Sequence, residues 1–156
     1  MTEDEKLREA ILVGAKILIE NGLKDWKIKL SNRRTALADC NNTRKTIRFS
    51  KHFVRVAERD EFIGVAYHEV AHALLPSWVH HGPEFVKKCI EISPNADYVT
   101  RNHPVPIHKF ETNCPECGAE GHCNRQYKMG ICRRCAGGGK RIPVIYSQNI
   151  LKVTVW

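Results

Sequence analysis

The sequence predicts an α+β core, residues 1–110, followed by a small β module, residues 111–156. Three observations lead to this division. The core begins with a helical apolar pattern and continues with strand-like alternation. An apolar helix then carries an H-E-x-x-H motif, and the module carries two C-x-x-C pairs. A chain of 156 residues is long enough for one core with a small appendage.

Residues 2–21 are predicted to form the first helix. Thr2 and Glu5 fit a capping box, and Gly22 fits the position just after a helix end. Small and apolar residues recur at helical spacing. They are Leu7, Ala10, Ile11, Gly14, Ala15, Ile17 and Leu18. We expect this helix to cover one face of a sheet.

Three strands are predicted after the first helix. Residues 25–31 alternate apolar and basic side chains, which indicates a half-buried strand. Residues 33–40 and 43–50 are the second and third strands, with the turn residues Asn41 and Asn42 between them. We expect the three strands to form a small antiparallel meander.

An apolar helix is expected between Asp60, its predicted N-cap, and Pro76. His68 and His72 are four residues apart, so their imidazoles lie one turn apart on one helix face. Two such imidazoles can hold one Zn²⁺, and Glu69 beside them can take a proton from a water molecule. A helix with two ordinary hydrogen-bonded histidines is the alternative. Burial in an apolar helix disfavours it, because unpartnered polar groups are costly there.

A catalytic zinc needs a third protein ligand. His80 and His81 are adjacent candidates, just ahead of Gly82 and Pro83, which can turn the chain and start a helix over residues 83–92. Spacing alone does not separate the two neighbours. Glu84 is a further candidate.

The motif H-E-x-x-H-A followed by H-G-x-x-F resembles the SprT-like family of zinc metalloproteases, which includes DNA-dependent proteases. The matching residues are His68, Glu69, His72, Ala73, His81, Gly82 and Phe85. The resemblance implies a zincin-like core and a zinc-dependent endopeptidase. It also implies that His81 joins His68 and His72 as zinc ligand and that Glu69 is the general base. Donors that could stabilise the oxyanion are Tyr67, Tyr98, His80 and His103, which the sequence does not rank.

The second chemical feature is the pair Cys114 and Cys117 followed, after 14 residues, by the pair Cys132 and Cys135. Two C-x-x-C knuckles at this separation predict a structural four-cysteine zinc site of the zinc-ribbon type. A redox C-x-x-C motif is the alternative, but it does not explain two copies. Because the segment has little apolar core of its own, zinc binding and folding should be coupled.

Strands are predicted at residues 142–146 and 150–155. We expect them to pair as a hairpin that either completes the ribbon or docks on the core, with Trp156 packing there. In the SprT-like family such a ribbon helps to engage DNA, so the resemblance implies DNA contacts here. The candidates are Arg125, Tyr127, Lys128, Arg133 and Arg134. Cations on a ribbon can meet phosphates, and a tyrosine can stack on a base. The alternative is a ribbon that only stabilises the fold or grips substrate protein.

Composition limits the location and the partners. The formal charge is +8, of which residues 1–94 carry +3 and residues 95–156 carry +5, so the C-terminal third is the more basic part. No apolar run is long enough to span a membrane. The acidic start, residues 2–5, is unlike a signal peptide. Seven cysteines, four of them in C-x-x-C pairs, favour a reducing compartment. We therefore expect a cytoplasmic protein, with nucleoid association as a further option.

Together these patterns predict a zinc metalloendopeptidase with one catalytic and one structural zinc. By resemblance, its substrates are proteins bound or crosslinked to DNA, as in DNA–protein crosslink repair. Two alternatives remain. One is a nucleic-acid-binding or protein-binding module with weak or no protease activity. The other is a general metalloprotease that DNA does not stimulate.

Overall fold

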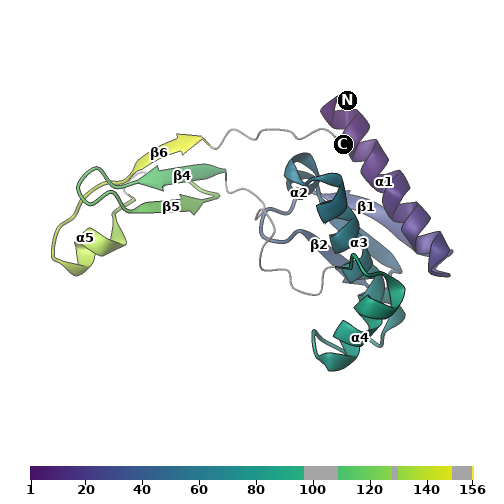
Figure 1. Ribbon diagram of the computed structural model, residues 1–156. Helices are drawn as coiled ribbons and strands as arrows, with labels where there is room; N and C mark the ends of the chain where they lie inside the picture. The colour runs from purple at the N-terminus through teal and green to yellow at the C-terminus, as the bar shows by residue number, and fades with distance from the viewer. Residues whose placement is uncertain (97–108, 128–129, 149–155) are drawn as a thin grey trace. The chain divides into compact units, whose positions relative to one another are not determined.

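The computed structural model describes residues 1–96, 109–127, 130–148 and 156. The chain divides into two compact units, which Figure 1 shows as ribbons. The core unit comprises Met1–Pro106 and Lys152–Trp156, and the ribbon unit comprises Ile107–Leu151. The α+β class predicted from the sequence is confirmed. The assignment of 1–110 and 111–156 as functional domains stays a prediction.

The first helix, α1 (Glu3–Glu20), begins with the predicted capping box. The Glu5 backbone N–H donates to Thr2 Oγ1 at 3.2 Å, and the Thr2 N–H donates to a Glu5 carboxylate oxygen at 2.6 Å. Leu7, Ala10 and Leu18 on the inner face are buried. The local pattern of residues 2–21 was therefore sufficient to place this helix and its start.

The core sheet is mixed, which corrects the predicted antiparallel meander. Strands β1 (Lys27–Ser31), β3 (Thr46–Ser50) and β2 (Ala38–Asn41) lie in that order, with β1 parallel and β2 antiparallel to β3. Side-chain burial explains why β3 is the central strand. Ile47 and Phe49 of β3 are 0% and 1% exposed, and the central position covers them best. The less apolar strands take the edges, and among the described residues β2 has one free edge.

The helices lie on one face of this sheet. Helix α1 contacts β1 and also α3 (Arg59–Leu74), which contacts β2. A Cβ atom at Gly14 would lie only 3.2 Å from Ile28, so the glycine permits the close approach of α1 to β1. Helix α2 (Lys51–Val56) contacts α1, and α4 (Pro83–Ile92) packs on α3.

Helix α3 begins two residues earlier than the sequence indicated. Its N-cap is Glu58, whose N–H donates to the Glu61 carboxylate at 2.7 Å, so the prediction of Asp60 was wrong. Helix α4 begins with Pro83, as predicted, and buries Phe85 and Cys89 completely. The turn between α3 and α4 therefore brings residues 76–82 next to the H-E-x-x-H helix.

The ribbon unit is a three-stranded antiparallel sheet with a short helix. Strands β5 (Glu120–Cys123), β4 (Phe110–Asn113) and β6 (Ile145–Gln148) lie in that order, and α5 is Arg133–Gly137. Of the predicted strand 142–146, only Ile145 and Tyr146 pair with β4, and the pairing continues to Gln148. Its predicted partner, residues 150–155, lies outside the described residues.

Trp156 packs in the core unit, which decides between the two places predicted for it, the ribbon and the core. Its indole N–H donates to the Ala57 carbonyl at 2.8 Å, and its ring lies 5.0 Å from that of Phe62. Burial decides this, because the core unit offers a large aromatic cluster and the ribbon unit offers little beside its cysteines.

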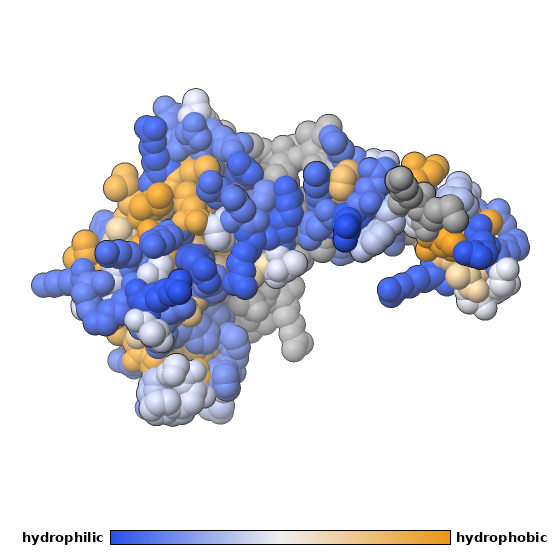
Figure 2. Space-filling view, turned by 180° about the vertical axis from the view of Figure 1, so that it is seen from behind, coloured by the Kyte–Doolittle hydropathy of each residue, from blue (hydrophilic) through white to orange (hydrophobic). Residues whose placement is uncertain are grey.

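In Figure 2 blue residues dominate the face shown, and apolar residues gather in patches on the unit that contains α1. None of the helices in the described part of the chain is long and apolar enough to cross a membrane.

Candidate metal centres

Helix α3 presents the two motif histidines on its inner face, as the spacing predicted. Their rings lie 5.0 Å apart between centroids, and His68 is only 3% exposed. Phe85 of α4 lies behind both rings, with its centroid 4.3 Å from that of His72 and 4.8 Å from that of His68. A rigid aromatic side chain thus restricts the orientation of both imidazoles.

The turn after α3 brings His81 to the same point. His81 Nε2 lies 3.1 Å from the Nε2 atoms of both His68 and His72. These three residues form one of the two groups of potential metal ligands found among the described residues. His80 lines the neighbouring cleft and is not part of this group. Geometry therefore favours His81 over His80 as third ligand.

The three imidazoles fit a zinc ion. A single N–H can bridge two ring nitrogens, but His81 Nε2 cannot satisfy two neighbours with one proton. A cation that accepts all three lone pairs removes this conflict. A tetrahedral ion with Zn–N bonds of 2.0–2.1 Å would hold nitrogens about 3.3 Å apart, close to the 3.1 Å observed here.

Burial keeps His72 in the form that binds metals. Loss of solvent lowers the pKa of His72 to about 4, and the neighbouring rings of His68, His81 and His80 act in the same direction. The imidazole is therefore neutral at pH 7, with its lone pair free for a cation.

Glu69 lies in the same site and is 7% exposed. Burial raises its pKa to about 8, and the negative charge of Asp39 adds to the shift. A dication beside this carboxyl would favour the ionised form. A carboxyl group with a pKa of about 8 can both take up and release a proton near neutral pH.

A cleft of about 720 Å³ opens over these groups. One wall is the edge strand β2 with its flanking loops, residues 35–43, and the other is formed by α3 and residues 77–81. On β2, Asp39 accepts hydrogen bonds from Arg33 at 3.0 Å and from Arg48 at 2.8 Å. The free edge of a strand therefore runs beside the histidine group.

Asn42 is a site residue that the sequence interpretation missed. Its side-chain amide donates to the carbonyls of His72 and Leu75, both at 3.3 Å. Its carbonyl oxygen accepts from the Cys40 thiol at 3.2 Å. Asn42 had been assigned only to a turn, because no local signal connects it with a helix 30 residues further on.

Of the predicted oxyanion donors, two can be placed. His80 lines the cleft. Tyr67 packs against the apolar clusters of the core. Tyr98 and His103 lie outside the described residues.

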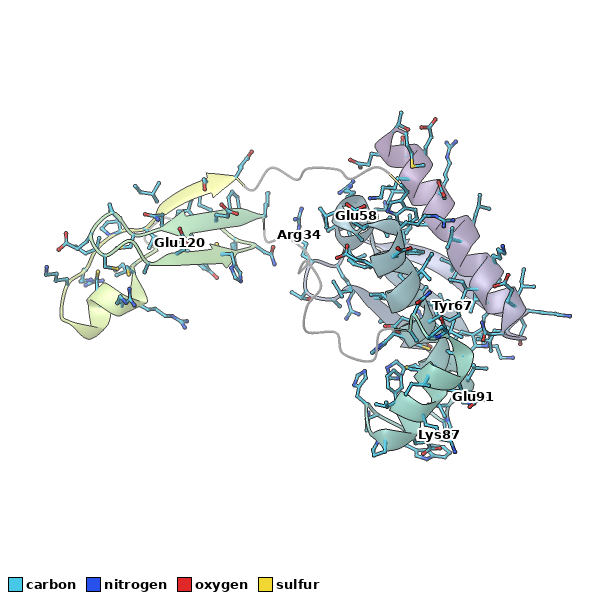
Figure 3. All side chains as sticks on the ribbon, viewed as in Figure 1. Arg34, Glu58, Tyr67, Lys87, Glu91 and Glu120 are labelled. Atoms are coloured by element: carbon cyan, nitrogen blue, oxygen red, sulfur yellow. The ribbon has the colours of Figure 1, made fainter. Side chains whose placement is uncertain are left out.

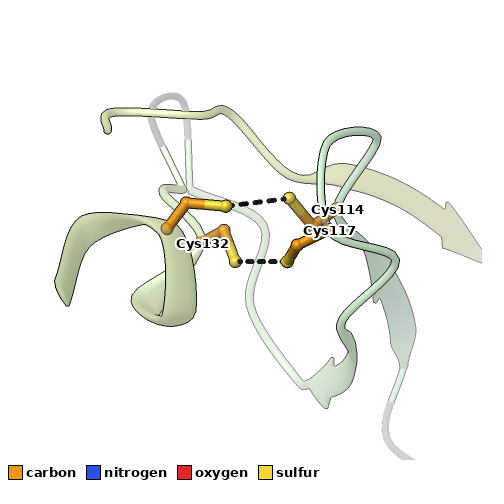
Figure 4. A group of neighbouring side chains, drawn as sticks. Cys114, Cys117 and Cys132 are labelled. Atoms are coloured by element: carbon orange, nitrogen blue, oxygen red, sulfur yellow. Dashed lines mark hydrogen bonds between the residues drawn. The ribbon is translucent and has the colours of Figure 1, made fainter. Parts of the chain in front are cut away.

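The second metal-ligand group is the predicted set of four cysteines. Cys114 Sγ lies 3.8 Å from Cys135 Sγ, and Cys117 Sγ lies 3.6 Å from Cys132 Sγ (Figure 4). These distances are too long for disulfides. They match the spacing of about 3.8 Å that a tetrahedral ion with Zn–S bonds of 2.3 Å requires.

The knuckle around Cys114 favours a thiolate. Backbone N–H groups of Cys117 and Glu116 lower the pKa of Cys114 to about 7, against the opposing effect of burial. Gly118 follows in the left-handed conformation, with φ of 66°, and its N–H donates to the Cys114 carbonyl at 2.9 Å. The loop is thus shaped to hold a negative sulfur, as a zinc knuckle does.

The predicted DNA-contact residues lie on the ribbon unit. Arg125, Arg133 and Arg134 are exposed, and Tyr127 is 58% exposed. Lys128 lies outside the described residues. Tyr127 borders a hollow of about 310 Å³ together with Tyr146.

The fold and the histidine site define a zincin-like, metalloprotease-like class of protein. The profile of the SprT-like family matches residues 9–107, more than half of the chain. The chain therefore belongs to the SprT-like family, and the resemblance seen in the sequence is confirmed. No curated protein sequence matches this chain closely enough to narrow the assignment.

Proposed function

We propose that this protein is a zinc-dependent endopeptidase in which His68, His72 and His81 hold the catalytic metal and Glu69 is the general base. The observation that supports it most is the convergence of three imidazole nitrogens beside a buried carboxyl group. A structural ion, by contrast, has four protein ligands and no adjoining cleft.

Zinc held by the three histidines would supply a Lewis acid that polarises the substrate carbonyl. Glu69 would take a proton from the attacking water on a carboxylate oxygen and return it to the leaving amine nitrogen. The free edge of β2 would pair with the backbone of an extended substrate and place one peptide bond over the site.

We further propose that the substrates are proteins bound or crosslinked to DNA and that the ribbon unit contacts the nucleic acid. Tyr127 and Tyr146 border a hollow, and exposed arginines lie on the same unit. An exposed aromatic ring can stack on a base, and arginines can pair with phosphates. Four thiolates holding zinc in the ribbon unit would carry −2, which reduces its positive charge without reversing it.

The test is cleavage of a DNA-binding protein by the zinc-loaded chain, with and without single-stranded DNA. We expect Glu69→Gln to lower the rate by about 10²–10⁴-fold, because that is the usual contribution of a general base. Zinc content should stay at two ions per chain. Glu84→Gln is the control, since this exposed carboxyl lies three residues after His81 and outside the histidine group. Equal rates for wild type and Glu69→Gln would contradict the endopeptidase proposal.

The DNA proposal is tested in the same assay. We expect single-stranded DNA to stimulate cleavage and added salt to reduce the stimulation. Tyr127→Ala should weaken DNA binding, whereas Tyr127→Phe keeps the ring and should not. Cleavage that requires Glu69 but ignores DNA would leave a general metalloprotease. Retention of two zinc ions without any cleavage would favour a binding module.

A further inference from the structure

A second depression adjoins the histidine site on its α4 side. It has a volume of about 490 Å³ and is lined by His81, Gly82, Pro83, Val86, Lys87 and Ile90. We call it the α4 groove. It shares His81 with the cleft that runs along β2. Its lining includes Lys87, labelled on α4 in Figure 3, and no acidic side chain.

The apolar residues that line the groove are not the ones that pack α4 against α3. Phe85 and Cys89, on the opposite side of this helix, are 0% exposed and attach it to α3. Ile90, in contrast, is 60% exposed. Pro83, Val86 and Ile90 recur at helical spacing, so they form one outward stripe. A single exposed isoleucine is normal on a protein surface. An apolar hollow next to a candidate metal ligand, however, lies where a bound ligand would contact it.

We propose that the α4 groove receives an apolar side chain of the substrate polypeptide, one or two residues from the bond that is cut. This inference rests on the proposed endopeptidase function. Residues of an extended peptide advance by 3.2–3.4 Å, so a chain whose carbonyl lies at His81 brings a neighbouring side chain to the groove. The occupant is aliphatic or aromatic, because Pro83, Val86 and Ile90 offer it no hydrogen-bond partner.

The groove also has a consequence for whether the substrate is folded or unfolded. Large apolar side chains are mostly buried in folded proteins. A site that requires one beside the cut therefore selects unfolded or loosened segments. Selection by an apolar pocket is moderate, since one methylene group changes kcat/KM by about 10–200-fold.

The experiment maps cleavage sites in an unfolded protein substrate by mass spectrometry, with the full zinc-loaded chain. Wild type is expected to show Leu, Ile, Phe or Met enriched at one position next to the cut. Ile90→Ser should lose this enrichment and cut the preferred peptide about tenfold more slowly, with a smaller loss for a peptide that has alanine at that position. Ile90→Lys should shift the preference toward Asp and Glu. Leu12→Ser on α1 is the matched control, because Leu12 is also exposed, at 69%, and lies outside the groove.

A binding measurement separates this inference from the proposed function. The Ile90 methyl signals of the full chain are followed by NMR while an acetylated, amidated alanine peptide with one central leucine is added, and the all-alanine peptide serves as reference. Shifts with leucine only support the groove, even if Glu69-dependent cleavage is absent and the endopeptidase proposal fails. Glu69-dependent cleavage without apolar enrichment, or enrichment that survives in Ile90→Ser, overturns the inference and leaves the proposed function intact.

Discussion

At the scale of single residues, burial controls the chemistry of several titratable side chains. It raises the pKa of Glu69 to about 8 and lowers that of His72 to about 4. The Cys40 thiol beside them is half-buried. Its desolvation raises its pKa to about 12 and keeps it protonated as a donor to Asn42. Desolvation thus favours the neutral form of every one of these groups before a cation arrives.

His52, away from the histidine site, gives a pH prediction. Burial lowers its pKa from 6.5, and the positive charges of Arg34 and Arg55 add to this effect, against a raising effect of Glu3. Above pH 6.5 the ring is neutral in both states. Below it the unfolded chain takes up a proton that the folded ring resists, so the free energy of unfolding falls. We expect the melting temperature to drop less between pH 7 and pH 5 in His52→Gln than in wild type. Equal drops would contradict the prediction.

At the scale of elements, the position of His72 depends on the turn between β2 and β3. Asn42 in this turn holds the last turn of α3 by two hydrogen bonds, to the carbonyls of His72 and Leu75. A helix end has carbonyls without intrahelical partners, and a side-chain amide satisfies two of them here. The edge strand of the cleft and the helix that carries His68 and His72 are thereby fixed to each other.

Asn42→Ala should therefore lower the free energy of unfolding by about 1–3 kcal/mol, at about 0.5–1.5 kcal/mol for each hydrogen bond. It should also weaken zinc binding at the histidine site without affecting the cysteine site. Urea denaturation and a zinc titration measure both effects. Asn41→Ala is the control at the neighbouring position, the end of β2, because the Asn41 side chain accepts from the Arg44 backbone N–H and has no hydrogen bond to α3 among the described residues. Similar effects of both variants would show that the turn, and not its contact with α3, matters.

The ribbon unit depends on its cysteines for an interior. Its only buried cluster among the described residues consists of Cys114, Cys132 and Cys135, with a few half-buried neighbours. Cys132→Ser should reduce the zinc content from two ions to one and unfold the ribbon unit, while the histidine site keeps its ion. Elemental analysis and amide exchange can verify this. Cys123→Ser should retain both ions, since Cys123 lies outside the four-cysteine group.

At the scale of the whole molecule, the chain leaves the core unit at Pro106 and rejoins it at Lys152. Trp156 forms part of the core after this return. Its ring lies against Phe62, and the Lys6 ammonium lies 5.1 Å from the ring centroid. Lys6 is 1% exposed and donates to the carbonyls of Ala57 at 2.9 Å and Arg55 at 3.1 Å. The C-terminal residue thus covers a buried cation.

Trp156→Ala should destabilise the core unit by about 2–4 kcal/mol, since removal of a packed aromatic side chain costs about 3–5 kcal/mol and Trp156 is only partly buried. The substitution would uncover the Lys6 ammonium, which would then be hydrated, and this limits the loss of stability. Chemical denaturation monitored by far-UV circular dichroism gives the value. Trp78→Ala is the control, because Trp78 is 75% exposed. A change below about 0.5 kcal/mol for Trp156→Ala would mean that the contact contributes nothing to stability.

The sequence alone determined the features that depend on neighbours along the chain. The capping box of α1, the four-residue spacing of His68 and His72, and the C-x-x-C knuckles all lie within one element or turn. Helical periodicity and metal-ligand spacing describe such features fully. The family assignment rested on the same short motifs, and the match to residues 9–107 confirms it.

The tertiary structure decided what depends on burial and on contacts between distant segments. It brought His81, and not its neighbour His80, into the histidine group. It placed β3 at the centre of a mixed sheet, joined Asn42 to α3 across 30 residues, and docked Trp156 on Ala57 across 99 residues. Such contacts form where apolar area and hydrogen-bond partners become available in space, and no local pattern encodes that.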